Sequence, residues 1–139
     1  MLLLQKSPTS THVMHLYDIF VMKDEEILVL EYPHHGMTLC KYVHRNRGRL
    51  TEIVVKHIIR QLVVALQHCM HHGIFHNTHM KNILIYPNSL QVKLMDFRGA
   101  LILPETRESA SPTPPTVDVF DDALLNSANV FLQELMNPF

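Results

Sequence analysis

The chain of 139 residues is long enough for one domain with a hydrophobic core and too short for two ordinary domains. It is 47% hydrophobic and 18% charged with a formal net charge of -1, so neither nucleic acid nor a membrane is expected as a partner. No apolar run reaches the roughly 20 residues of a membrane span or the pattern of a signal peptide. Its two cysteines, Cys40 and Cys69, form no disulfide framework. We expect a soluble, intracellular protein of the cytoplasm.

The first part of the chain predicts a loose lead-in and then a β-hairpin. Residues 1–12 include Ser7–Thr11, which is turn chemistry without periodic burial. Residues 13–22 and 27–30 are apolar and rich in strand-forming residues, and the charged residues between them predict a turn. Proline and glycine then stop the second strand, so residues 31–37 are expected to form a linker.

Two helices are predicted after the linker. Leu39, Tyr42 and Val43 repeat at helical spacing and predict a short helix over residues 38–45. A longer helix is predicted from a cap at Thr51 to Gly73, which would be the C′ residue. Its apolar stripe would face the core and comprises Val54, Ile58, Leu62, Ala65, Leu66 and Cys69.

A second hairpin follows the long helix. Ile83–Ile85 and Val92–Leu94 read as strands joined by a turn at residues 87–89. The polar loop His76–Asn82 enters this hairpin and residues 96–98 leave it. Both flanks are therefore expected side by side.

The pattern weakens after Gly99. Residues 104–118 are rich in serine, threonine and proline, and we expect them to be mobile. A helical pattern returns from residue 119 or 121 to 136, with its apolar residues on one face.

The loop, the hairpin and the following Asp-Phe pair resemble the catalytic loop and metal-binding segment of protein kinases, H-R-D-x-K-x-x-N and D-F-G. The matching residues are His76, Asn82, Asp96 and Phe97; the resemblance implies a structural, inward-pointing role for His76. The departures are Asn77 for arginine, Thr78 for aspartate, Arg98 for glycine, and a loop one residue shorter. The resemblance implies an α+β, partial protein-kinase-like fold over residues 13–139, with small-lobe strands in 13–30, the linker, and part of the large lobe in 38–139.

Within that family, the chain looks most like the Pim group of serine/threonine kinases. The similarity runs without a gap from Arg47-Gly48 to Phe75-His76. Pim kinases carry a proline in the linker where other kinases offer a backbone N–H to adenine, and Pro33 stands at that place.

The resemblance implies ATP and Mg²⁺ as cofactors. Glu31, Pro33, Asn82 and Asp96 would be the nucleotide-binding candidates, and Asn82 and Asp96 the Mg²⁺ ligands. Thr78 occupies the catalytic-base position and cannot accept a proton at neutral pH. The four glycines form no phosphate-covering loop, and neither the phosphate-pairing lysine nor an A-P-E element is present in the chain.

Three functions follow from these features. The first is a truncated, catalytically inactive Pim-like chain that acts by binding, with a protein partner on its large lobe. The second is a fragment of a working ATP-dependent serine/threonine kinase. The third is a histidine-rich metal-binding protein, since histidines cluster at the end of the long helix and in the following loop: His68, His71, His72, His76 and His79.

Overall fold

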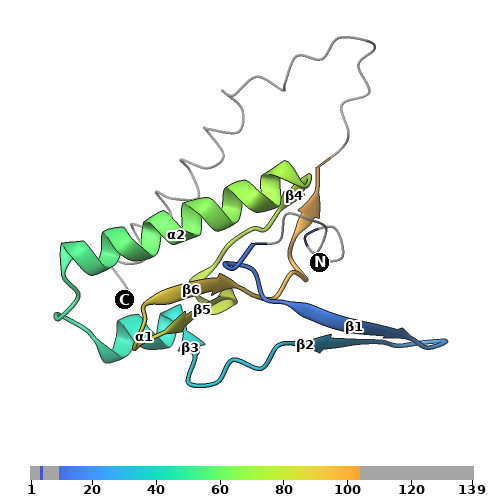
Figure 1. The fold of residues 1–139 in the computed structure, drawn as a ribbon, viewed down its shortest axis with the longest axis horizontal. Coiled ribbons are helices and arrows are strands. Elements are labelled where there is room, and N and C mark those ends of the chain that lie inside the picture. The colour runs from blue at the N-terminus through green and yellow to red at the C-terminus, as the bar shows by residue number, and fades with distance from the viewer. Residues whose placement is uncertain (1–3, 5–9, 104–139) are drawn as a thin grey trace, which may run out of the picture.

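The computed structural model describes Leu4 and residues 10–103 (Figure 1). Both the segment 104–118 and the last predicted helix lie outside the described residues. In chain order the elements are β1 (Leu16–Val21), β2 (Glu26–Leu30), β3 (Met37–Thr38), α1 (Leu39–Arg45), α2 (Glu52–His71), β4 (Ile74–Phe75), the 3-10 turn η2 (Met80–Asn82), β5 (Ile83–Tyr86), β6 (Gln91–Leu94) and β7 (Leu101–Ile102).

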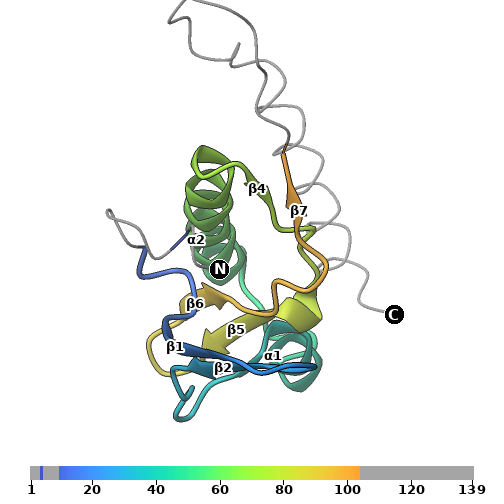
Figure 2. The same cartoon turned by 90° about the vertical axis from the view of Figure 1, so that its right-hand side faces the viewer.

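The described strands form three small antiparallel sheets, with strand orders β1-β2, β3-β5-β6 and β4-β7. Helix α2 packs against β6 and β4, and α1 packs against β5 and η2. The β1–β2 hairpin projects from this body (Figures 1 and 2). The expected α+β, partial kinase-like arrangement is confirmed.

Both predicted helices are present with the expected ends. The Thr51 side chain accepts a hydrogen bond from the backbone N–H of Val54 and caps α2. Gly73 follows the C-cap at φ +71°, a conformation that costs glycine little. The predicted stripe supplies the buried residues Ile58, Leu62, Ala65, Leu66 and Cys69. By length and composition α2 could cross a bilayer, a test that the core helix of a soluble protein also passes.

The β5–β6 hairpin forms the centre of the described core. Ile83 pairs with Leu94 and Ile85 with Val92, and all four side chains are fully buried. Leu90, at φ +57°, takes the strained position of the turn. The predicted hairpin is therefore confirmed.

Four hydrogen bonds close the outer edge of β6. The N–H of Val92 donates to Gln61 Oε1 (2.9 Å), and its carbonyl accepts from His12 Nδ1 (3.0 Å). The N–H of Leu94 donates to the carbonyl of His12 (2.7 Å), and its own carbonyl accepts from the N–H of Met14 (2.9 Å). An open strand edge invites pairing with another chain, and this edge is occupied.

The lead-in expected over residues 1–12 is not loose at either described part. Leu4 is buried in the core at 1% exposure, and His12 is hydrogen-bonded to β6 through backbone and side chain. The turn-forming residues Ser7–Thr11 give no information about contacts with a strand 80 residues later in the sequence. The local composition therefore could not predict that the described parts of this segment contact the core.

The β1–β2 hairpin was also predicted, but its burial is unusual. Apolar side chains are exposed on both of its faces, including Phe20, Met22, Ile27 and Leu28. A stable sheet normally buries at least one face. As a two-stranded sheet it therefore contributes little to the described core.

Candidate functional site

His76 is the fixed centre of the candidate site. Its side chain is 1% exposed, and its ring packs edge-on against Phe97 with centroids 4.6 Å apart. Its Nε2 donates to the carbonyl of Met95 (3.2 Å), because a carbonyl can only accept. Burial lowers the pKa of His76, against the opposing effects of the Met95 hydrogen bond and nearby Asp96. His76 therefore points inward and is held by its neighbours, as the expected structural role requires.

Thr78 turns its hydroxyl toward His76. The distance from Thr78 Oγ1 to His76 Nδ1 is 3.2 Å. Since the neutral ring carries its proton on Nε2, Nδ1 is an acceptor and the threonine hydroxyl is the donor. The hydroxyl proton at the expected catalytic-base position is thus committed to a buried imidazole.

Neither residue that could occupy the catalytic-base position of the shortened loop, Asn77 or Thr78, is a carboxylate. Asn77, between His76 and Thr78, is exposed and adopts φ +53°. Whether Asn77 or Thr78 is aligned with the family's aspartate, the side chain is neutral. A general base of the carboxylate type is therefore missing at either position.

Asp96 lies beside this loop, as predicted, and both its oxygens are engaged. Arg98 Nε donates to Asp96 Oδ1 (2.8 Å) and Arg98 Nη2 to Asp96 Oδ2 (2.6 Å), a two-pronged pair. The Arg98 backbone N–H also lies 3.3 Å from Oδ1. These hydrogen bonds from Arg98 are the main reason why the pKa of Asp96 falls from 3.8 to about 2.

Asn82 is placed next to Asp96 by the backbone. The carbonyl of Asn82 accepts from the N–H of Met95 (2.9 Å), one residue before Asp96, and its own N–H donates to His79 (2.8 Å). The two predicted metal ligands are therefore brought together. However, Mg²⁺ needs oxygen ligands with free lone pairs, and Arg98 holds a positive charge on the carboxylate. The residues as arranged do not fit Mg²⁺.

The two linker candidates are also engaged elsewhere. Glu31 accepts two hydrogen bonds from Lys93 Nζ (2.6 and 2.9 Å) and one from the N–H of His15 (3.1 Å). Pro33 has no N–H to offer, and its carbonyl accepts from the N–H of Gly36 (3.0 Å) in a turn. A Cβ at Gly36 would stand 3.1 Å from a methyl of Leu84, so the linker lies tightly on β5.

The histidines do not assemble into a metal site within the part of the chain that the structure describes. In that part no group of three or more His, Cys, Asp or Glu side chains is placed to hold a metal ion. The rings of His68 and His72 contact each other at a tilt, with centroids 4.5 Å apart, and His72 Nδ1 donates to the carbonyl of His68. His76, as described, is used by Thr78 and Met95.

Three features of the site were missed from the sequence. Lys93 fixes Glu31, and Gln61 links α2 to β6 by bonding both Leu90 and Val92. Strands β4 and β7 pair and so tie the residues before His76 to those after Gly99. The β4 and β7 strands are two residues each, too short for a periodic signal. Neither polar contact has a local sequence signature.

The loop, the hairpin and the Asp-Phe segment lie together around His76, an arrangement that defines a protein-kinase-like large-lobe core. The position expected to hold a proton-accepting carboxylate has a neutral side chain. The carboxylate expected to bind a metal ion is paired with an arginine.

Comparisons with known proteins agree with this class. The profile of the protein kinase domain matches residues 1–116, so the chain belongs to the protein kinase family. The carbon catabolite-derepressing protein kinase of Candida tropicalis is 33% identical over 86 residues, which cover 62% of this chain and 13% of the relative. NUAK family SNF1-like kinase 1 of Homo sapiens is 33% identical over 87 residues, again 62% and 13%. The chain therefore matches only about an eighth of the length of these relatives.

Proposed function

We propose that this chain is a catalytically inactive member of the protein kinase family that acts by binding. The observation that carries the proposal is the pairing of Arg98 with both oxygens of Asp96, next to a loop whose base position is neutral. Phosphoryl transfer depends on metal ions that neutralise the phosphates and on a carboxylate that accepts the hydroxyl proton. Both requirements fail at the same place.

The loss of the base alone would not abolish transfer. General-base help is worth about 10²–10⁴-fold in rate. Thr78 gives none of it, since its hydroxyl donates to His76 and is a far weaker base than a carboxylate. The pairing of Arg98 with Asp96 obstructs the metal position and so removes a further part of the electrostatic stabilisation, and turnover should therefore be very low.

The Pim-like assignment is the finer part of the proposal. Pro33 supports it, because a linker residue without an N–H cannot make the usual donor contact to adenine. The carbonyl of Pro33 is used by Gly36 as well. Of the two relatives reported above, the human one carries an SNF1-like name, and neither name mentions the Pim group.

A binding role would use the large lobe, whose core of α2, β5 and β6 is intact, with a protein as partner. ATP and Mg²⁺ are the cofactors that the family implies, and we expect neither to bind tightly here. A cytoplasmic location remains a prediction from composition.

A second candidate is a fragment of a working serine/threonine kinase. It is favoured by the small share of the relatives' length that the chain matches. Sequencing the complete transcript distinguishes the two, because a working enzyme needs a glycine-rich loop, a lysine and an A-P-E element elsewhere. Thr78 would remain, so we expect even a longer product to transfer phosphate poorly.

The proposal is tested by titrating the full chain with ATP, with and without Mg²⁺, in a thermal-shift experiment, together with a phosphate-transfer assay on a generic basic peptide. We expect no Mg²⁺-dependent rise in melting temperature and no transfer above background. Turnover at ordinary kinase rates that disappears in Asp96→Ala would refute the proposal.

A further inference from the structure

The charges of this chain are separated along its length although they nearly cancel overall. Residues 32–95 contain eight lysine and arginine residues and one acidic residue, Glu52. Residues 15–31, which form the β1–β2 hairpin, contain five acidic residues and one basic residue, Lys23. One part of the molecule is therefore strongly basic and another strongly acidic.

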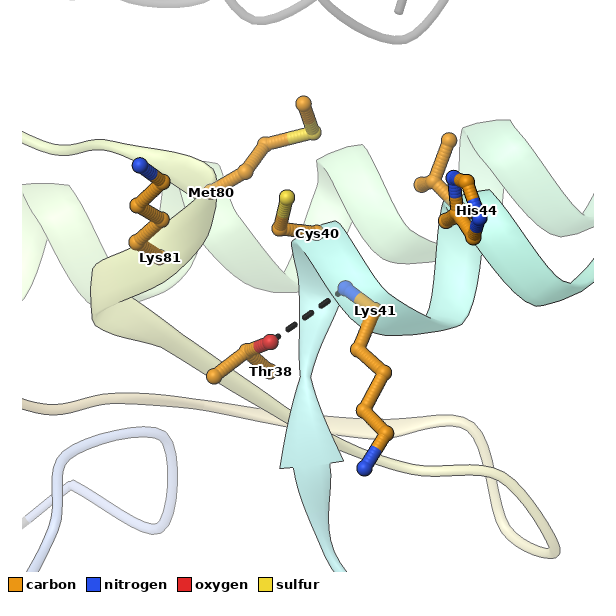
Figure 3. A pocket seen from close by; sticks show the side chains of 7 residues that line it. Thr38, Cys40, Lys41, His44, Met80 and Lys81 are labelled. Atoms are coloured by element: carbon orange, nitrogen blue, oxygen red, sulfur yellow. Dashed lines mark hydrogen bonds between the residues drawn. The ribbon is translucent and has the colours of Figure 1, made fainter.

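A cavity in the basic part lies between α1 and η2. It has a volume of about 340 Å³ and is lined by Thr38, Cys40, Lys41, Val43, His44, Met80 and Lys81. In Figure 3 the side chains of Cys40 and Met80 lie near each other and point to the same side, whereas Lys41 of α1 extends to the opposite side and Lys81 comes from η2. Among the described residues, no carboxylate lies within ion-pair distance of either lysine. The cavity is thus apolar inside with two unpaired cations at its walls.

The tip of the β1–β2 hairpin has the complementary character. Phe20 pairs with Ile27, and Met22 is two residues beyond Phe20, so these side chains share one face. They are 51%, 43% and 57% exposed. The exposed Asp24 and Glu25 form the turn, which the hydrogen bond from Met22 N–H to the carbonyl of Glu25 closes.

We propose that the hairpin tip of one molecule docks in the α1–η2 cavity of a second copy of this chain. A closed cavity of about 150 Å³ holds a benzene molecule, so a cavity of this volume has room for the side chain of Phe20 or Met22. Asp24 and Glu25 would then meet Lys41 and Lys81. The cavity shares Met80 and Lys81 with the loop His76–Asn82, but the inference does not depend on the lack of activity.

Charge favours contacts between a tip and a cavity over contacts between two tips or two cavities. Two tips facing each other would bring acidic turns together, and two cavities would bring lysines together; both cost free energy. In Figure 1 the tip and α1 lie at opposite ends of the molecule's long axis, so docking one on the other joins different ends of two copies. Made once per pair, this contact adds copies in rings or open chains; made in both directions by two antiparallel copies, it closes a dimer.

The experiment uses the full chain and two double variants, checked for folding by circular dichroism. The tip variant is Asp24→Lys with Glu25→Lys, and the cavity variant is Lys41→Glu with Lys81→Glu. A variant of α2 with the same charge change, Lys56→Glu with Arg60→Glu, is the matched control. Molar mass is measured by light scattering after size-exclusion chromatography over a range of protein and salt concentrations.

The unaltered chain and the α2 control should self-associate, and association should weaken from 0.1 M to 1 M salt, where the screening length falls from about 10 Å to about 3 Å. Each double variant should associate at least about tenfold more weakly, because repulsion replaces attraction at the surface. In the tip variant both surfaces are basic, and in the cavity variant both surfaces are acidic. Each surface of one variant is therefore complementary in charge to the opposite surface of the other, so mixing the two variants should restore association. A chain that carries all four changes should associate again.

A monomeric full chain at every concentration would overturn the proposal. Equal association of the full chain and both double variants would also overturn it, because non-specific aggregation through exposed apolar surface does not need these charges. A mixture of the two variants that associates no more strongly than each variant alone would have the same consequence.

Discussion

The pair formed by Asp96 and Arg98 gives the sharpest test of the inactive site. Arg98→Gly removes the guanidinium and restores the residue that the D-F-G pattern has at this place. Arg98→Lys keeps a positive charge but cannot make the two parallel hydrogen bonds that a guanidinium makes. The two variants therefore separate the effect of charge from the effect of geometry.

The expected magnitude comes from the pKa of Asp96. It lies at about 2 instead of 3.8, chiefly because of hydrogen bonds from the Arg98 side chain. Arg98→Gly should return it toward 3.8, and Arg98→Lys should give an intermediate value. The residual effect of His76, which also lowers this pKa, should remain in both variants.

The assay is a carbon-detected NMR titration of the Asp96 carboxyl group in labelled protein. Mn²⁺, a paramagnetic substitute for Mg²⁺, is then added at neutral pH. Line broadening at Asp96 and Asn82 should be stronger in Arg98→Gly than in the unaltered chain, because the carboxylate oxygens become available.

The pairing of Asp96 with Arg98 also predicts that stability falls at acidic pH. A carboxyl group with a lowered folded-state pKa stabilises the fold above its unfolded-state pKa, and this contribution is lost as the pH falls from about 4 to about 2. The contribution is small because Arg98 is 90% exposed and solvent screens the pair. Arg98→Gly should remove this part of the acid dependence.

A titration of Asp96 near 3.8 in the unaltered chain would refute the reasoning, since Arg98 could not then be seated on the carboxylate. Unchanged Mn²⁺ broadening after Arg98→Gly would show that Arg98 is not what obstructs the metal position.

Three further predictions concern the frame of the site. Gln61→Leu should lower stability by about 1–3 kcal/mol, the cost of leaving the partners of a partly buried amide unsatisfied, whereas Gln67→Leu on the exposed face of α2 should have little effect in urea unfolding. Burial lowers the pKa of His76, so stability should fall as the pH drops below 6.5, and His76→Gln should flatten unfolding curves measured between about pH 8 and pH 5. Lys93→Met should lower the free energy of unfolding by about 1.5–3 kcal/mol, because it leaves Glu31 without its cation. A double-mutant cycle with Glu31→Gln should show coupling between Lys93 and Glu31, and additive effects would contradict the pairing.

The core of the fold could be predicted because its signals are local. The stripe of α2, its Thr51 cap and Gly73 at its end are read from short-range spacing, and the observed helix begins and ends as expected. The β5–β6 hairpin likewise has strand-forming runs on either side of turn residues. Their close placement beside His76 follows from chain connectivity alone.

The contacts that decide the chemistry were less accessible. The sequence shows Arg98 as a departure from glycine, but it does not predict the two side-chain hydrogen bonds from Arg98 to Asp96, which is at φ +58°. The pairing of Lys93 with Glu31 and the bonds of Gln61 join residues 62 and about 30 positions apart. A single sequence contains no record of such distant partners.

For hairpin β1–β2 the sequence predicted the strands but not how their side chains are exposed. Its strands were predicted from composition, and the pairing of Phe20 with Ile27 agrees with that prediction. Its apolar residues are nevertheless exposed on both faces. Strand propensity reports fit to a pleated, half-buried surface, and it does not say which surface supplies the cover. The exposed hairpin is therefore the part of this fold whose stability depends most on a partner. Substituting Phe20 with threonine should leave the free energy of unfolding of the α2–β5–β6 core nearly unchanged, whereas the same substitution at the buried Val92 should lower it strongly.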